Sequence, residues 1–285
     1  MDLLITKSNQ VVKLSDLGFY NIAISESSPT LSLDKRTVRG RNGTIYDGLT
    51  YNRKEIVVSA RVAVDSIQAY MQLEDDIRGL LLDSEPYFIT KMRPKIENLY
   101  DFEQPGQRSG DLDLQNAEHM PWHYRHKVTA DKPSFSFIGK TAQGLKYDFS
   151  ILFATAEMPF GETVPKDITL SNGAIPYLGN ATFSQLEYPY AVVLAASGGQ
   201  NSFYLTIDGR RFNFSQASPI KAGTVITITG NGTMVKGPGE SLATNSTDKT
   251  NYEFFELRPN LFKQVGYSTN FKGSIVIRGF KEIYR

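Results

Sequence analysis

The stretch Ser202-Phe-Tyr-Leu-Thr-Ile-Asp-Gly-Arg-Arg-Phe-Asn-Phe214 predicts two strands joined by the dipeptide Asp208-Gly209. A two-residue Asp-Gly link needs positive φ at its central positions, and the turn that results matches the twist of the strands on either side. The alternation of side chains then selects the same register as the turn, which is the condition for a well-specified hairpin. The stretch therefore indicates an antiparallel β-hairpin.

The register of this hairpin gives it one apolar face. Pairing across the turn places Phe203 opposite Phe214 and Leu205 opposite Phe212. Ile207 lies on the same face, and we expect all five side chains to be buried. A face of this kind is typical of a β-sandwich. Proteins of this class more often bind ligands or form assemblies than catalyse reactions. The opposite face carries Tyr204, Thr206, Arg211 and Asn213.

Further short strands surround the hairpin at the spacing of a sandwich. A segment rich in turn formers, Met158 to Pro165, precedes them and marks a boundary. We therefore predict a galectin-like C-terminal β-sandwich domain over residues 159–285. Its other expected strands are Tyr190–Ala195, Thr224–Thr229, Tyr252–Leu257 and Gly273–Tyr284.

The first half of the chain combines strands with one helix. Period-two alternation predicts strands over Glu55–Val64 and Leu145–Phe153, and an apolar stripe at helical spacing predicts a helix over Ser66–Leu82. Asp65 is the expected N-cap, with Gln68 three residues later in a capping-box arrangement. These elements predict an N-terminal α+β domain over residues 1–158, so that the fold class is mainly β.

Two segments of this domain have no regular pattern. The turn signals Asn42-Gly43 and Asp47-Gly48 are separated by only three residues, which is too few for a strand between two hairpin tips. We expect an extended arm or an irregular loop there. Four prolines interrupt residues 91–134, and a long insertion or arm is expected. The arginines that bracket the first segment are Arg36, Arg39, Arg41 and Arg53.

Composition narrows the function classes. The 285 residues carry 31 Lys and Arg against 30 Asp and Glu, so the net charge is only +1. This balance does not indicate the excess of basic residues that a nucleic-acid-binding surface needs. The chain contains no cysteine, which excludes disulfides, thiolate nucleophiles and zinc–thiolate sites. Neither a signal peptide nor a long apolar run is present, so we expect synthesis in a cytosol and no membrane insertion.

Three histidines form the strongest candidate metal site. His119, His123 and His126 follow one another at spacings of four and three, which would place three imidazoles on one face of a helix. Pro121 lies inside the turn that such a helix needs, and no glutamate completes an H-E-x-x-H arrangement. A solvated or interface loop is the favoured interpretation, and we predict no metal.

Glycines and carboxylates give no catalytic site. The glycines Gly230, Gly232, Gly237 and Gly239 follow a strand, but their spacing matches no phosphate-binding loop and no helix follows them. A glycine-rich turn of a β-domain is expected. Glycoside hydrolysis would need two carboxylates in a cleft, whereas the acids here lie on a helix surface or in polar loops. We predict no enzyme and no cofactor. The acids considered are Glu74, Asp75, Asp101, Glu103, Asp111 and Asp113.

Aromatic side chains provide the alternative hypothesis. Several of them could form a platform on which sugar rings stack, which would make the sandwich a carbohydrate-binding module for host cell-surface sugars. Most aromatic residues at alternating strand positions are core residues, so this alternative ranks second. The candidate platform residues are Trp122, Tyr177, Tyr188, Tyr190 and Tyr204.

The whole chain resembles the distal tail proteins of long, non-contractile-tailed bacteriophages, particularly those that infect Gram-positive hosts. The resemblance rests on patterns. One departure is the turn Arg258-Pro259-Asn260-Leu261, where the family pattern reads Pro-Gly-x-Asn. The stretches that carry the resemblance are Arg39-Gly-Arg-Asn-Gly43, Arg53-Lys-Glu-Ile-Val-Val-Ser59, Tyr147-Asp-Phe-Ser-Ile-Leu-Phe153, Met158-Pro-Phe160, Pro189-Tyr-Ala-Val-Val193, the Asp-Gly hairpin, Lys221-Ala-Gly-Thr-Val-Ile-Thr-Ile228, Phe255-Glu-Leu-Arg-Pro-Asn260 and Ser274-Ile-Val-Ile-Arg-Gly-Phe-Lys-Glu-Ile-Tyr284.

The resemblance implies a structural protein without enzymatic activity. In such a family the N-terminal domain forms a hexameric ring, and a galectin-like sandwich lies on its outside. The ring would join the tail tube protein to a tail-associated tip protein and to receptor-binding proteins, at the distal tail tip of the virion. Near-zero net charge does not oppose self-association.

Overall fold

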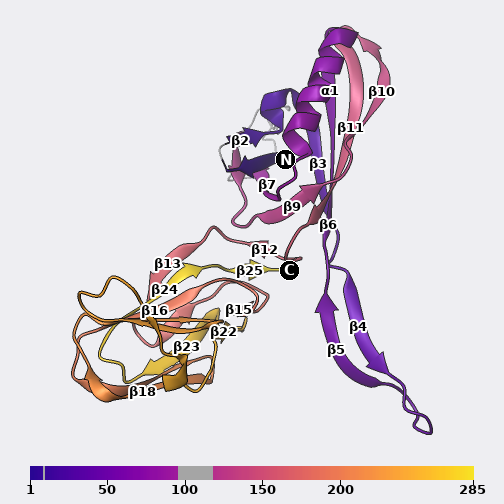
Figure 1. Cartoon of the computed structure of the whole chain (residues 1–285). Helices are drawn as coiled ribbons and strands as arrows, with labels where there is room; N and C mark the ends of the chain where they lie inside the picture. The colour runs from indigo at the N-terminus through magenta and orange to yellow at the C-terminus, as the bar shows by residue number, and fades with distance from the viewer. Residues whose placement is uncertain (9, 96–117) are drawn as a thin grey trace, which may run out of the picture. The chain divides into compact units, whose positions relative to one another are not determined.

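The computed structural model describes residues 1–8, 10–95 and 118–285, and these residues form two compact units (Figure 1). Unit 1 comprises residues 1–161 together with Arg285, and unit 2 comprises residues 162–284. Both units consist mainly of β-strands. The mainly β fold class predicted above is confirmed.

Unit 1 is a large sheet covered by a helix. Over the described residues its strands follow the order β2-β1-β7-β9-β11-β6-β3, with β8 paired to β7 and β10 paired to β11. The 3₁₀ turn η1 (Ser15–Leu17) joins β2 to β3. The strands are β1 (Asp2–Lys7), β2 (Gln10–Lys13), β3 (Phe19–Glu26), β6 (Glu55–Val64), β7 (Tyr87–Pro94), β8 (His119–Pro121), β9 (His126–Ala130), β10 (Ser134–Thr141) and β11 (Gly144–Thr155).

The core of unit 1 lies between β6, β11 and the helix α1 (Ile67–Leu81), which crosses these strands in Figure 1. Alternate residues of β6 and β11 point to the helix and are buried, as the period-two pattern predicts. From the helix, Ile77 and Leu81 complete this core, and the ring of Tyr70 stacks on that of Tyr147 at 4.1 Å. The predicted strands and helix of the first half are confirmed.

The start of the helix differs from the expectation by one residue. Ser66, not Asp65, is the N-cap, because the Ser66 Oγ accepts a hydrogen bond of 3.1 Å from the amide N–H of Ala69. Serine and aspartate are both favourable N-cap residues, so the sequence could not show which of these two neighbours caps the helix. Ser66 has the extended backbone that an N-cap needs, with φ of −147°.

Replacement of Ser66 by alanine is expected to lower the free energy of unfolding by about 1 kcal/mol, because the first turn of α1 loses its capping bond. Asp65→Ala is the matched control and should change stability by no more than about 0.5 kcal/mol. Urea denaturation followed by the fluorescence of Trp122, the single tryptophan, monitors unit 1. Equal losses in the two variants would contradict the assignment of the cap.

The expectation of a long insertion over residues 91–134 is wrong wherever the structure describes that segment. The end of β7, all of β8 and all of β9 lie within it, and β9 pairs with both β7 and β11. Pro94 is the last residue of β7 and pairs with a residue of β8, and Pro121 is the last residue of β8 and pairs with a residue of β7. These prolines therefore mark the ends of strands and are compatible with a sheet. Residues 96–117 lie outside the described part of the chain.

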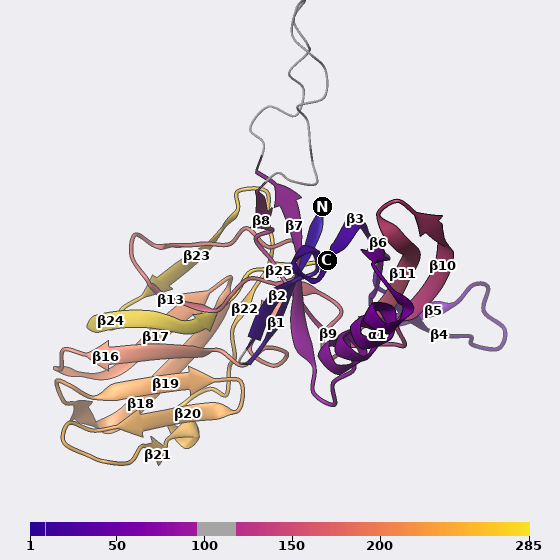
Figure 2. The same ribbon diagram turned by 90° about the horizontal axis from the view of Figure 1, so that it is seen from above.

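Unit 2 is a β-sandwich of two main sheets. One has the order β13-β24-β16-β19-β20-β21, and the run from β24 to β21 is seen side by side in Figure 2; the other has the order β14-β23-β17-β18. Pairs of short strands, β15 with β22 and β12 with β25, accompany them, and η2 (Thr247–Lys249) follows β21. The strands are β12 (Gly161–Glu162), β13 (Lys166–Thr169), β14 (Ala174–Pro176), β15 (Phe183–Ser184), β16 (Ala191–Ala196), β17 (Gln200–Ile207), β18 (Arg210–Ile220), β19 (Val225–Thr229), β20 (Gly232–Lys236), β21 (Thr244–Asn245), β22 (Glu256–Leu257), β23 (Gln264–Thr269), β24 (Gly273–Phe280) and β25 (Ile283–Tyr284).

The Asp-Gly hairpin is present in the predicted register. Phe203 pairs with Phe214 and Leu205 with Phe212 across β17 and β18, and all of these side chains are buried together with Ile207. Asp208 and Gly209 have φ values of 48° and 80°, as the turn requires. The hairpin therefore supplies the apolar face of one sheet to the core of the sandwich.

Two other predicted strands of unit 2 are shorter than expected. Only Glu256 and Leu257 of the segment 252–257 form a strand. Tyr252 cannot begin one, because its φ of 57° lies outside the range of strands. The last predicted strand is divided into β24 and β25 by Lys281 and Glu282. Lys281 leaves the ladder and forms an ion pair of 2.7 Å with Glu162.

Candidate interaction surfaces

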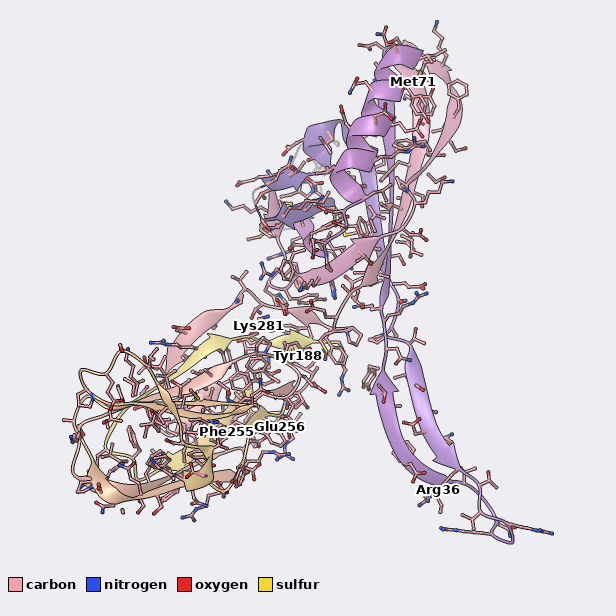
Figure 3. The ribbon with its side chains drawn as sticks, viewed as in Figure 1. Arg36, Met71, Tyr188, Phe255, Glu256 and Lys281 are labelled. Carbon is pink, nitrogen blue, oxygen red and sulfur yellow. The ribbon has the colours of Figure 1, made fainter. Side chains whose placement is uncertain are left out.

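A two-stranded arm extends from the sheet of unit 1 (Figure 1). It consists of β4 (Leu31–Arg36) and β5 (Ile45–Tyr51), and Arg36, labelled in Figure 3, lies where β4 ends and the tip begins. Of the two expectations for this segment, an extended arm or an irregular loop, the structure has the arm, which is formed by two paired strands. The signal Asp47-Gly48 is not a turn, since both residues lie inside β5 beside an irregularity in the register at Asp34 and Lys35.

One face of the arm is apolar and open to solvent. The register pairs Leu31 with Tyr51 and Leu33 with Leu49, so that these side chains share a face. The three leucines are between 37% and 53% exposed, and Tyr46 near the tip is 61% exposed. A two-stranded ribbon is at best marginally stable alone in water. The arm therefore presents an apolar surface that another structure has to cover.

The root of the arm contains a nearly buried cluster of charges. The Glu26 carboxylate, at the end of β3, lies 2.5 Å from the Lys54 Nζ and 2.7 Å from the Lys91 Nζ. The Nε2 atom of His126 is 3.6 Å away. The side chains of Lys54 and His126 are each only 5% exposed, and that of Glu26 is 12% exposed. Four separate elements therefore meet at one carboxylate.

Electrostatics keeps this carboxylate ionised. Burial by itself raises the pKa of Glu26, but the neighbouring His126, Lys54 and Lys91 side chains outweigh burial and hold the pKa well below its usual range. A buried cation such as Lys54 is stable only beside a compensating negative charge. The cluster thus joins β3, β7, β9 and the residue that precedes β6 where the arm leaves the sheet.

Among the described strands of unit 1, β2, β3, β8 and β10 each pair on one side only. The edges of β3 and β10 flank the same part of the sheet. Of the described strands, β3 pairs only with β6, and β10 pairs only with β11. The backbone groups on the outer side of each strand are therefore available to another chain. Between these edges, the sheet face opposite α1 carries small side chains in register, because Ala23, Ser59, Ser150 and Ser134 follow one another across β3, β6, β11 and β10.

The three histidines do not converge on one point. His126 is buried in β9, His119 is half-buried in β8, and His123 is exposed in the connection between them. His123 instead packs against the ring of Trp122 at 4.5 Å. No group of three or more potential metal ligands from His, Asp and Glu occurs within the described residues.

The glycines and carboxylates have structural surroundings. Gly230 lies in the turn that joins β19 to β20, as expected for a glycine-rich turn of a β-domain. Glu74 and Asp75 lie on α1, where Glu74 forms an ion pair of 2.6 Å with Arg78. The remaining acids considered, Asp101, Glu103, Asp111 and Asp113, fall outside the described residues.

The aromatic residues considered for sugar binding do not form one platform. Tyr177, Tyr188 and Tyr190 are core residues of unit 2. Tyr204 is half-buried, and the guanidinium of Arg211 covers its ring at 4.2 Å. Trp122 belongs to unit 1.

Sequence reasoning missed the apolar face of the arm and the cluster around Glu26. The first had a signal, since apolar residues alternate on both sides of the tip at Leu31, Leu33, Leu49 and Tyr51. The second had none, because its members are far apart in the sequence. No helix among the described residues has the length and apolarity needed to cross a membrane.

No family model and no curated protein matches this chain. Solved structures do. The crystal structure of the SPP1 Dit (gp 19.1) protein, described as a paradigm of the hub adsorption apparatus in Gram-positive infecting phages, is 11% identical over 99% of each chain, with a TM-score of 0.60. The phage P2 baseplate in its activated conformation with Ca is 9% identical over 99% of this chain and 97% of that chain, with a TM-score of 0.38. The first comparison shows that this chain shares the fold of the SPP1 Dit protein.

Proposed function

We propose that this chain is a distal tail protein, a structural hub that links the tail tube of a phage to its tip. The observation that carries the proposal is the arm β4–β5, which presents an uncovered apolar face on a unit whose fold is shared with the SPP1 Dit protein. A second copy of the chain can cover this face in a way that every copy repeats. The role is structural, and no catalytic group is assigned to it.

The proposed assembly is a closed ring of six copies formed by unit 1. Rings use heterologous contacts, in which one surface of each copy meets a different surface of the next. The open edges of β3 and β10 are two such different surfaces at opposite sides of one sheet region, and pairing between edges is a common mode of recognition. The ring would lie at the distal tail tip, between the tail tube protein and the tail-associated tip and receptor-binding proteins.

The mass and shape of the full chain in solution test this proposal. Native mass spectrometry is expected to find an assembly of about six times the 31.9 kDa mass of the chain, and electron microscopy is expected to show closed rings. A monodisperse monomer at high concentration would contradict it. If such a monomer also bound glycans on an array, with loss of binding in Tyr204→Ala, the carbohydrate-binding alternative would replace it.

A further inference from the structure

A hydrogen-bonded turn of unit 2 holds two large apolar side chains in solvent. The turn runs from Arg258 to Lys263, between β22 and β23. Arg258 fixes its start by an ion pair of 2.8 Å with Asp208, and Asn260 fixes its centre. The Asn260 Oδ1 accepts from the amide N–H of Phe262 at 2.9 Å, and its Nδ2 donates to the carbonyl of Gln264 at 2.6 Å.

Leu261 is 97% exposed and Phe262 is 83% exposed, so neither side chain packs on its own chain. Leu178, itself 54% exposed, lies next to this turn, because the amide N–H of Tyr177 donates to the carbonyl of Lys263 at 3.0 Å. Single apolar side chains on a surface are ordinary, but adjacent ones on a preorganised turn are typical of interaction sites. We call residues 259–263 the apolar knob.

Unit 2 also contains a hollow that its own knob does not fill. The hollow is an open depression of the surface with a volume of about 610 Å³. The segment that contains Tyr188, labelled in Figure 3, forms part of its wall. The residues of the hollow used in this argument are Leu186, Glu187, Tyr188, Pro189 and Arg278.

We propose that the apolar knob of one copy docks into this hollow on the unit 2 of a neighbouring copy. The knob is apolar, and the wall of the hollow contains the exposed Leu186 and Pro189 among polar side chains such as Gln185 and Asn231. The two surfaces use different residues of the same unit, so the contact is heterologous and can repeat around a ring. This inference rests on the proposed function, because it assumes that copies of the chain assemble side by side.

The charges of the two surfaces agree with this contact. No ion pair is found for Lys263 of the knob or for Glu187 of the hollow among the described residues. Burial and the nearby Glu256, labelled in Figure 3, raise the pKa of Glu187, so a cation beside it would be stabilising. Lys263 supplies this cation. Arg278 also lines the hollow and can donate to a backbone carbonyl of the knob.

Disulfide trapping in the full chain tests the contact, and the natural absence of cysteine removes any background. The double variant Phe262→Cys with Leu186→Cys is expected to give a ladder of covalent multimers under mild oxidation, which reducing agent removes. Leu242→Cys with Leu186→Cys is the matched control, since Leu242 is also strongly exposed in unit 2. We expect a yield about tenfold above this control, because docked thiols have a high effective concentration. Either single variant can form no product larger than a dimer.

The mass of the unoxidised double variant separates the two proposals. If the double variant assembles but gives no more covalent ladder than the Leu242→Cys control, the knob contact is wrong and the hub proposal is unaffected. If the double variant is a monomer, both proposals are wrong. A charge exchange provides the second measurement. Lys263→Glu added to the cysteine pair should reduce the ladder, and the further change Glu187→Lys should restore it. A ladder that Lys263→Glu leaves unchanged would contradict the proposed ion pair.

Discussion

Replacement of Leu31, Leu33 and Leu49 by serine is expected to leave the chain folded and to prevent its assembly. These side chains line the apolar face of the arm and make little contact with the rest of unit 1, since each is more than a third exposed. Full burial of an exposed leucine contributes about 1.5 to 3 kcal/mol, and about half of this applies here because each leucine is already partly covered in the chain. Loss of all three should weaken self-association by about two orders of magnitude.

Sedimentation of the triple variant over a range of concentrations measures this effect. The matched control changes the other face of the same arm, by Ser32→Ala with Thr50→Ala, because the register pairs these two residues with each other. The control should assemble as the unchanged chain does. If the leucine variant assembled with unchanged affinity, the apolar face would not be the contact between copies.

The substitution Glu26→Gln is expected to lower the free energy of unfolding of unit 1 by about 3 to 5 kcal/mol, the range found when one partner of a buried ion pair is removed. The glutamine leaves Lys54 nearly buried with no negative charge beside it. Asp148→Asn is the control, because the Asp148–Arg61 pair in the same unit is half exposed and should contribute about 1 kcal/mol or less. Urea denaturation followed by Trp122 fluorescence measures both.

The pH dependence of this loss has a defined sign. The pKa of Glu26 is lower in the folded chain than its ordinary value of 4.5, so the carboxylate stabilises the fold above pH 4.5. This contribution falls as the pH drops below 4.5 toward the lower pKa of the folded state. The stability difference between the unchanged chain and Glu26→Gln should therefore be constant above pH 5 and shrink in acid. A difference that grew in acid would contradict the assignment of the carboxylate.

Sequence patterns predicted those helices and strands that are determined by residues close together in the chain. The Asp208-Gly209 hairpin was predicted to the residue because its turn type and its alternating side chains depend only on neighbours in the sequence. The same reasoning failed at Asp47-Gly48, because Gly48 pairs with Asp34 in the ladder to β4 and Asp47 is the one extra residue at an irregularity in its register. Pro94 and Pro121 suggested an insertion because their positions at strand ends depend on pairing between distant segments.

The candidate surfaces depend on contacts between residues that are far apart in the sequence, and on exposure that only the structure shows. Glu26, Lys54, Lys91 and His126 belong to segments separated by up to 100 residues, so no spacing rule brings them together. Leu261 and Phe262 are adjacent apolar residues with no strand pattern around them, and only the structure shows that their side chains are exposed. The arm was predicted as a segment, whereas its apolar face became evident from the strand register.

The manner in which the arm joins the sheet determines how it transmits force. Strands β4 and β5 continue from β3 and into β6 with only short connections, so tension applied at the tip passes along covalent backbone into two strands of the sheet. β6 is held on both sides, by β3 and by β11, and its ladder to β11 spans its whole length. A pull on the arm would load these backbone hydrogen bonds together and in shear, the direction in which a β-ladder resists separation collectively. Tension on the arm would therefore be borne by the central ladder of the sheet and not by single contacts at its root.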